Sequence, residues 1–208
     1  PLYQNDKIIG VLDIDSPIKK RFDETDKKYL EEFASILMEG SIVEMNALDA
    51  LKTRRSVRKF KAKTVEKEKI KEMIDTARLA PSGRNQQPID YIVVKDKKRR
   101  ERLADLAAHG NFIADAPVCI AVCSEKCEHE AEDGSASTEN ILLSARAQGL
   151  ASCWVAGYKK DYSPKVEEFL GLPDDYRLIS LIPIGYSDQE PSPPTKRKIE
   201  DVLHYEQF

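Results

Sequence analysis

The sequence predicts an α+β fold in which a central sheet lies between layers of helices. From Met45 onward, segments with helical periodicity alternate irregularly with short apolar segments typical of strands. The chain has 208 residues, of which 41% are hydrophobic and 33% charged. This length allows one core with an appendage, but not two full enzyme domains.

A change of composition near residue 45 divides the chain into an extension, residues 1–44, and a main domain, residues 45–208. In the extension, Lys7–Ile14 is typical of a strand, and Asp23 is a suitable N-cap for the helix that follows. That helix has one apolar stripe, formed by Leu30, Phe33, Ile36 and Leu37. One strand and one helix cannot close a core alone.

The main domain is predicted to contain three longer helices, two short helices, over 46–53 and from Ser163 to Gly171, and four strands. We expect helices over 46–53, 66–80, 97–108 and 137–148, a short helix from Ser163 to Gly171, and strands over 89–95, 117–123, 151–157 and 177–185. Thr64 is expected to cap the second helix and Pro81 to stop it, while Gly149 ends the fourth.

The charge distribution excludes some classes of protein. The net charge is −3, with −4 on residues 1–44 and +1 on the remainder, whereas a nucleic-acid-binding domain normally has a clear basic excess. No apolar run reaches the roughly 18 residues that a membrane span needs. The first residues show no basic segment leading into an apolar stretch, so we expect a cytoplasmic protein that binds neither nucleic acid nor membranes.

The cysteines have two possible interpretations. Cys119, Cys123 and Cys127 have a spacing that resembles a metal site near His129. However, Cys119 and Cys123 lie in an apolar segment that reads as a buried strand, where thiols four residues apart are separated by about 13 Å. We therefore favour cysteine as a small buried hydrophobe over a metal ligand.

Two basic clusters are candidate anion-binding segments. Arg54-Arg55-Ser56-Val57-Arg58 offers planar guanidinium groups and a hydroxyl, which suit a terminal phosphate. Lys196-Arg197-Lys198 is the second cluster. Either one alone is equally consistent with a solvated basic turn.

Two further segments combine small residues with polar groups. The loop Ala80–Pro88 contains Asn85, Gln86 and Gln87, which offer amide donors and acceptors to a planar ligand, although Pro and Gly alone would also suit a structural turn. The segment Gln148–Tyr158 ends a strand in Ala-Gly, where the backbone can approach a ligand. Its Trp154 is expected to belong to the core.

Together these segments resemble the FMN-dependent nitroreductase family. The resemblance covers residues 45–208 and rests on Arg-Arg-Ser-Val-Arg-Lys-Phe, Ala-Pro-Ser-Gly-Arg-Asn-Gln-Gln-Pro, Glu-Asn-Ile-Leu-Leu-Ser-Ala-Arg-Ala-Gln-Gly-Leu-Ala-Ser-Cys-Trp and Ile-Pro-Ile-Gly-Tyr. It implies a mixed, mainly antiparallel sheet flanked by helices, and a homodimer with FMN where the subunits meet. It also implies NADH or NADPH as hydride donor and a small-molecule oxidant.

The resemblance assigns cofactor-binding roles to individual residues. The FMN phosphate and ribityl chain would be held by Arg54, Ser56, Arg58, Arg197 and Lys196. Arg55 would contact the pyrimidine side or the ribityl hydroxyls. The segment beside the isoalloxazine, with a backbone N–H near N5, would be Val155, Ala156 and Gly157. The neighbouring subunit would contribute Pro81, Ser82, Gly83 and Asn85, and Asn111 is a further polar candidate.

Two departures from the family pattern concern the substrate side and the C-terminal cations. Ile89 stands where family members often have an aromatic residue, and the C-terminal basic residues are contiguous rather than spaced.

A separate resemblance concerns the extension. Ile9–Pro17, followed by Phe22–Asp26 and the predicted helix, looks like the end of a GAF domain, so we expect a remnant that packs on the main domain or assists dimerisation.

The sequence shows no nucleophile paired with a base. His109, His129 and His204 are scattered, and each is expected at the surface or at a helix end. A flavin enzyme needs no such pair, because the cofactor performs the redox chemistry. The resemblance implies ping-pong hydride transfer from NAD(P)H through flavin N5 to a nitroaromatic, quinone or similar acceptor. Flavin reduction, reductive dehalogenation and a non-catalytic flavin sensor remain alternatives.

Overall fold

The computed structural model describes residues 2–4, 7–10, 23–40 and 45–208. By its internal contacts the chain divides into two compact units, Pro1–Glu44 and Met45–Phe208. Residues 11–14 of the predicted first strand, and most of the GAF-like segment Ile9–Pro17, lie outside the described residues. The GAF resemblance stays a prediction.

The first unit contains a small antiparallel hairpin and one helix. Strand β1, Leu2–Gln4, pairs with β2, Lys7–Gly10. Helix α1, Glu24–Gly40, begins directly after Asp23, whose carboxylate Oδ1 accepts hydrogen bonds from the N–H groups of Thr25 and Asp26 at 2.8 and 3.0 Å. This is the capping role predicted for Asp23, because the first N–H groups of a helix have no partner within it.

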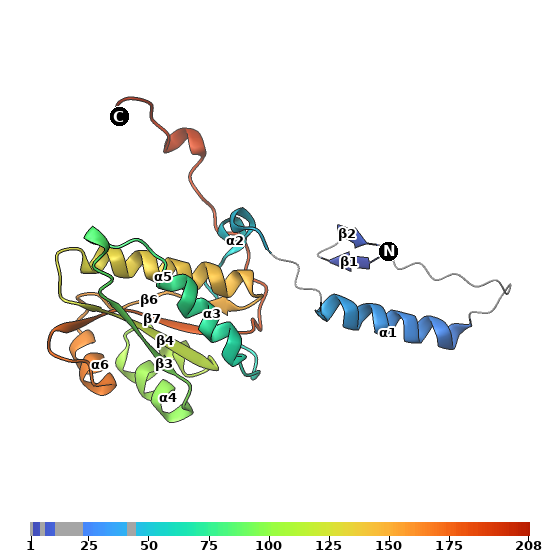
Figure 1. Ribbon diagram of the computed structural model, residues 1–208, viewed down its shortest axis with the longest axis horizontal. Coiled ribbons are helices and arrows are strands. Elements are labelled where there is room, and N and C mark those ends of the chain that lie inside the picture. Colours follow the sequence, from blue (N-terminus) through green and yellow to red (C-terminus); the bar gives the residue numbers. More distant parts are fainter. Residues whose placement is uncertain (1, 5–6, 11–22, 41–44) are drawn as a thin grey trace. The chain divides into compact units, whose positions relative to one another are not determined.

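The second unit is a three-layer α+β structure (Figure 1). Its sheet has the order β3-β4-β7-β5, with β6 also paired to β7, and every one of these strand pairs is antiparallel. The strands are β3 Ile89–Val94, β4 Val118–Glu125, β5 Ala151–Ser152, β6 Val155–Ala156 and β7 Tyr176–Gly185. Outside these strands, an isolated parallel bridge joins Ser56 to Ser152 of β5.

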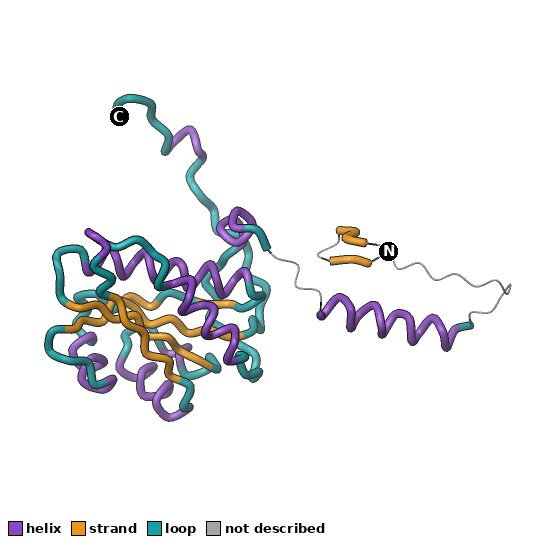
Figure 2. Tube along the Cα trace, in the orientation of Figure 1, coloured by secondary structure: helices purple, strands orange, loops and turns teal. Residues whose placement is uncertain are grey.

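Helices cover both faces of this sheet (Figure 2). On one face α5, Glu130–Ala147, packs against α3, Lys67–Ala77, and α2, Ala47–Thr53. On the other face lie α4, Lys97–Leu106, and α6, Ser163–Leu170. Short 3-10 turns are found at η1 Gly83–Asn85, η2 Asn111–Ile113 and η3 Ile199–Asp201.

Strand β4 is buried on both faces, and its alternate side chains enter two different cores. Val118, Ile120 and Val122 pack with the α3 and α5 side, whereas Cys119, Ala121 and Cys123 pack with the α4 and α6 side. Burial raises the pKa of the Cys119 and Cys123 thiols to about 12, so both stay protonated at neutral pH. The prediction of cysteine as a buried hydrophobe is confirmed.

Several predicted boundaries were wrong. Helix α3 begins at Lys67 after Glu66, so Thr64 is not its cap, and it ends at Ala77, three residues before the predicted end. Helix α5 begins at Glu130, seven residues before the predicted start, because its first half buries polar residues that hide the apolar periodicity. The strand predicted over 151–157 is interrupted between β5 and β6.

Gly134 lets α5 pack closely on β7. A Cβ atom at this position would lie 2.7 Å from both Cγ atoms of Ile179, a side chain that is 2% exposed and has no room to move. We expect Gly134→Ala to lower the free energy of unfolding by about 1–3 kcal/mol, because overpacking outweighs the roughly 1 kcal/mol gained in helix propensity.

Chemical denaturation of Gly134→Ala tests this expectation, with Ser135→Ala, the next residue on the same helix, as control. A variant as stable as the wild type would show that α5 and β7 are not in such close contact.

Candidate functional site

The basic segment predicted to bind phosphate lies beside the edge of the sheet. Helix α2 ends at Thr53, and the chain then continues in extended conformation, with the Val57 N–H donating to the Ser152 carbonyl at 3.0 Å. Because successive side chains of an extended segment point in opposite directions, Val57 is buried while Ser56 and Arg58 are exposed. The polar side chains are therefore presented to solvent next to β5.

These residues line a cleft of about 640 Å³, referred to below as the basic cleft. Its cations come from two distant parts of the sequence: Lys52, Arg54, Arg55, Arg58 and Lys196. None of its described lining residues is a carboxylate. The arrangement suits an anion with several oxygen acceptors.

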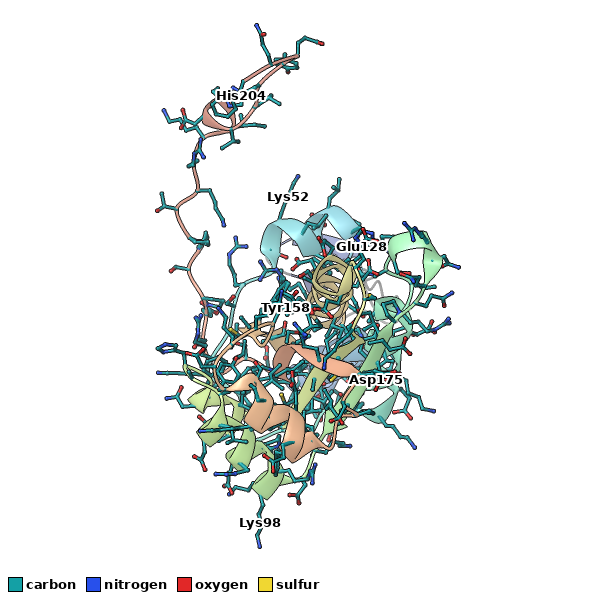
Figure 3. All side chains as sticks on the ribbon, turned by 90° about the vertical axis from the view of Figure 1, so that its left-hand side faces the viewer. Lys52, Lys98, Glu128, Tyr158, Asp175 and His204 are labelled. Atoms are coloured by element: carbon teal, nitrogen blue, oxygen red, sulfur yellow. The ribbon has the colours of Figure 1, made fainter. Side chains whose placement is uncertain are left out.

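Not all predicted cations enter the basic cleft in the same way. Lys196 lines it, whereas Arg197 does not and instead donates to the carbonyl of Asp201 in the exposed C-terminal segment. Figure 3 shows this segment, marked by His204, extending away from the sheet and its helices. The Arg55 guanidinium donates to the carbonyls of Lys52 and Arg54 at 2.9 and 2.8 Å, and so caps the end of α2.

A second cleft of about 600 Å³, the strand cleft, adjoins the first through Arg58, which lines both. Its other lining residues are Ala108, His109, Phe112, Cys153, Trp154, Val155, Ala156, Lys160, Asp161 and Tyr162. The Arg58 guanidinium carbon lies 5.6 Å from the centre of the Phe112 ring. Burial raises the pKa of Cys153, which is therefore a neutral thiol in the cleft wall.

The register of β6 on β7 determines which backbone N–H faces the strand cleft. Cys153 and Gly157 donate to the carbonyls of Pro183 and Ile179 at 3.3 and 2.9 Å. Since hydrogen-bonding positions alternate along an antiparallel pair, the peptide groups of Ala156 point away from β7. The Ala156 carbonyl accepts from the Tyr162 hydroxyl on that open side. Of the three predicted residues, Ala156 is thus the one whose N–H faces the cleft.

Gly157 has a packing role in the same segment. A Cβ atom there would lie 2.7 Å from Cγ of Leu178, and its carbonyl accepts from the Ser163 hydroxyl at the start of α6. The residue lets β6 continue closely against β7, while α6 holds the outer side of the turn. Its N–H is already used by the sheet.

The loop with Pro81, Ser82, Gly83 and Asn85 lies elsewhere in the unit. Gly83 contacts the first turn of α5 through Asp133, whereas Arg54 and Thr53 contact the later residues Glu139 and Arg146 of the same helix. Along α5, the rise from Asp133 is about 9 Å to Glu139, which contacts the cleft residue Arg54, and about 20 Å to Arg146, which contacts Thr53. The loop and the basic cleft are therefore separate within one chain, and the loop borders its own small cavity of about 110 Å³.

Some residues around the strand cleft were missed by sequence reasoning. His109, Phe112, Lys160 and Tyr162 line it, but they come from turns without a periodic pattern. Trp154, expected in the core, is half-buried and lines the cleft as well. Asn111 lines neither cleft, and its Oδ1 accepts from the Phe112 N–H at 3.1 Å.

The three histidines lie in different parts of the structure, and of these His109 lines the strand cleft. His129 is at the N-cap of α5 without a capping side-chain bond, and His204 packs against Phe208 in the exposed C-terminal segment. Among the described residues, no three His, Cys, Asp or Glu side chains gather in a way that could hold a metal ion. In the same part of the chain, no helix is both long and apolar enough to cross a membrane.

Comparison with known proteins places the second unit in a family. A model of the Nitroreductase family matches residues 51–126 and 109–186. A protein of Methanothermobacter thermautotrophicus, provisionally named NADH dehydrogenase/NAD(P)H nitroreductase, is 31% identical over 163 residues, or 76% of this chain and 85% of the relative. Separately, 37 residues are 62% identical to Protein YtsP of Bacillus subtilis, covering 18% of this chain and 23% of that protein.

The fold agrees with the sequence matches. The structure of an FMN-dependent nitroreductase from Clostridium difficile superposes with a TM-score of 0.74 at 32% identity, covering 77% of this chain and 99% of that one. Together with the family model, which spans more than half of the chain, these likenesses establish a common ancestry. The chain belongs to the nitroreductase family.

Proposed function

We propose that this protein is an FMN-dependent NAD(P)H oxidoreductase that reduces a nitroaromatic, quinone or similar acceptor. The observation that carries the proposal is that the basic cleft and the strand cleft are adjacent, with Arg58 lining both. An anion-binding end thus adjoins a more apolar space that one backbone N–H faces. FMN held by these residues would supply the redox chemistry, namely hydride transfer from NADH or NADPH to the acceptor.

The residues of the basic cleft suit the FMN phosphate. Arg54, Ser56 and Lys196 approach it from two ends of the sequence, and the described lining residues include no carboxylate. Arg54 is kept in place by Glu139 on α5, with 3.5 Å between Nε and Oε1. Lys196, which lines the basic cleft, is better placed to bind the phosphate than Arg197, which does not. Arg55 stabilises the basic segment by donating to the carbonyls of Lys52 and Arg54.

Residues where the two clefts meet suit the isoalloxazine ring of FMN. Arg58 brings a positive charge to the strand cleft, where it would stabilise negative charge at the pyrimidine edge of the reduced flavin. The Ala156 N–H provides a donor for N5, and Val155 and Gly157 keep its peptide in register with β7. Fixed donors of this kind cost no reorganisation during the reaction.

The remaining contacts would come from a second copy of the chain. Pro81, Ser82, Gly83 and Asn85 do not line the basic cleft of their own chain, since their loop contacts the first turn of α5 whereas Arg54 contacts its middle. We therefore propose a homodimer in which each loop completes the partner subunit's site, so that an isolated subunit has only half of the contacts.

The proposed activity is tested by absorbance spectra of purified protein before and after anaerobic NADH or NADPH. We expect a flavin spectrum that bleaches with either donor and returns when a nitroaromatic or quinone is added. Bound FMN that resists both donors would favour a flavin-binding sensor, and protein that takes up no FMN would refute the proposal. Parallel assays with free flavin and halogenated aromatics would identify the preferred acceptor.

Lys196 and Lys198 provide a matched pair of variants that tests which lysine binds the FMN phosphate. We expect Lys196→Ala to raise the dissociation constant of FMN by about tenfold, because a charge-assisted contact is lost. Lys198→Ala, at an exposed position outside the basic cleft, should change it less than about twofold. Fluorescence titration of apoprotein measures both constants, and equal effects would remove Lys196 from the site.

Complementation tests the shared site. Arg54→Ala and Asn85→Ala should each impair turnover alone, because each removes a contact from a different half. When the two variants are co-expressed, random pairing should restore about a quarter of the sites, since half of the dimers contain one complete site. Activity no higher than the mean of the separate variants would contradict a site built from two subunits.

A further inference from the structure

The loop between α3 and β3 has an unusual backbone. Arg84, Asn85 and Gln87 have φ angles of 53°, 56° and 52°, in the left-handed region that residues with a Cβ atom normally avoid. Three such residues within four positions persist only where surrounding contacts compensate for the strain. The side chains of residues 84–87 are exposed, so the loop is held mainly at its ends, by Ser82 and Gly83 on one side and by the buried Pro88, whose carbonyl accepts from the Glu125 N–H at 2.9 Å, on the other.

Asp133 supplies the main contact. Both of its carboxylate oxygens accept from the Gly83 N–H, at 3.0 and 3.1 Å. Asp133 is only 6% exposed and lies in the first turn of α5, where the positive end of the helix stabilises a carboxylate. Within the loop, the Ser82 hydroxyl accepts from the Gln87 N–H at 2.9 Å, which links the anchored end to the strained residues.

The fit of Gly83 against α5 supports the same anchoring. A Cβ atom on Gly83 would lie 2.4 Å from Cδ2 of His129, so the loop backbone lies directly on the start of the helix. Arg84 also reaches Glu128, with 3.9 Å between Nη2 and Oε2, although both side chains are largely exposed. Figure 3 labels Glu128 near this end of α5.

We infer that Asp133 is a positioning residue of the flavin site, although it need not touch the flavin. This inference rests on the proposed function. By holding Gly83, the carboxylate sets Ser82 and Asn85 in the conformation in which they meet the FMN of the partner subunit. A loop ordered in advance loses less conformational freedom on binding, so the affinity for FMN is higher.

Variants at two adjacent acids test the role. Asp133→Ala should raise the dissociation constant of FMN by about tenfold, and Asp133→Asn, which keeps the shape and one acceptor oxygen, by less. Glu132→Gln is the matched control, since it removes a negative charge from the same helical turn at an exposed position. It should leave the constant within about twofold.

Hydrogen exchange separates positioning from general destabilisation. In FMN-free wild-type protein the amides of residues 82–87 should exchange slowly, and Asp133→Ala should accelerate them while β4 stays protected. Rapid exchange of this loop in the wild type, uniform acceleration across the fold, or an unchanged FMN constant would each overturn the inference. Failure of the wild type to bind FMN would overturn the proposed function and the inference with it.

Discussion

The hydrogen bonds between β7 and the interrupted segment Ala151–Gly157 determine the geometry of both clefts. They fix β5 and β6 on the outer side of β7, and the bridge from Ser152 then fixes Ser56. The same register directs the Ala156 peptide toward the strand cleft, because alternate peptide groups of an edge segment are unpaired. A shift by one residue would turn that donor away and move the basic segment with it.

The sequence was sufficient for the fold class and for most elements, because glycine and proline signals and apolar periodicity mark them. It could not locate the start of α5, whose first turns bury Glu130 and Asp133 instead of an apolar stripe. It identified the basic segments, but not the difference between Lys196 and Arg197, which depends on the path of an exposed segment. The free N–H of Ala156 likewise follows from strand register, which residue identity does not encode.

The cations of the basic cleft favour the binding of an anion, but they lower the stability of the folded protein while the cleft is empty. Five cations share the basic cleft, and of these Arg54 is held by a carboxylate on α5. Like charges at close range repel, so a bound phosphate would relieve the repulsion and stabilise the folded protein through mass action. The first turn of α5 has the complementary role, since its buried acids contact the loop at one side and Tyr158 and Arg177 at the other.

The position of Arg58 between the two clefts limits how the protein can evolve. If FMN binds as proposed, this guanidinium faces both the anion-binding end and the flavin ring, so its replacement would alter cofactor retention and redox potential together. Selection for a new electron acceptor would then be freer to act on Ala108 and His109, which line the strand cleft but not the basic cleft. Those side chains lie on turns outside the sheet, where substitutions change the shape of the cavity without disturbing the strands beneath it.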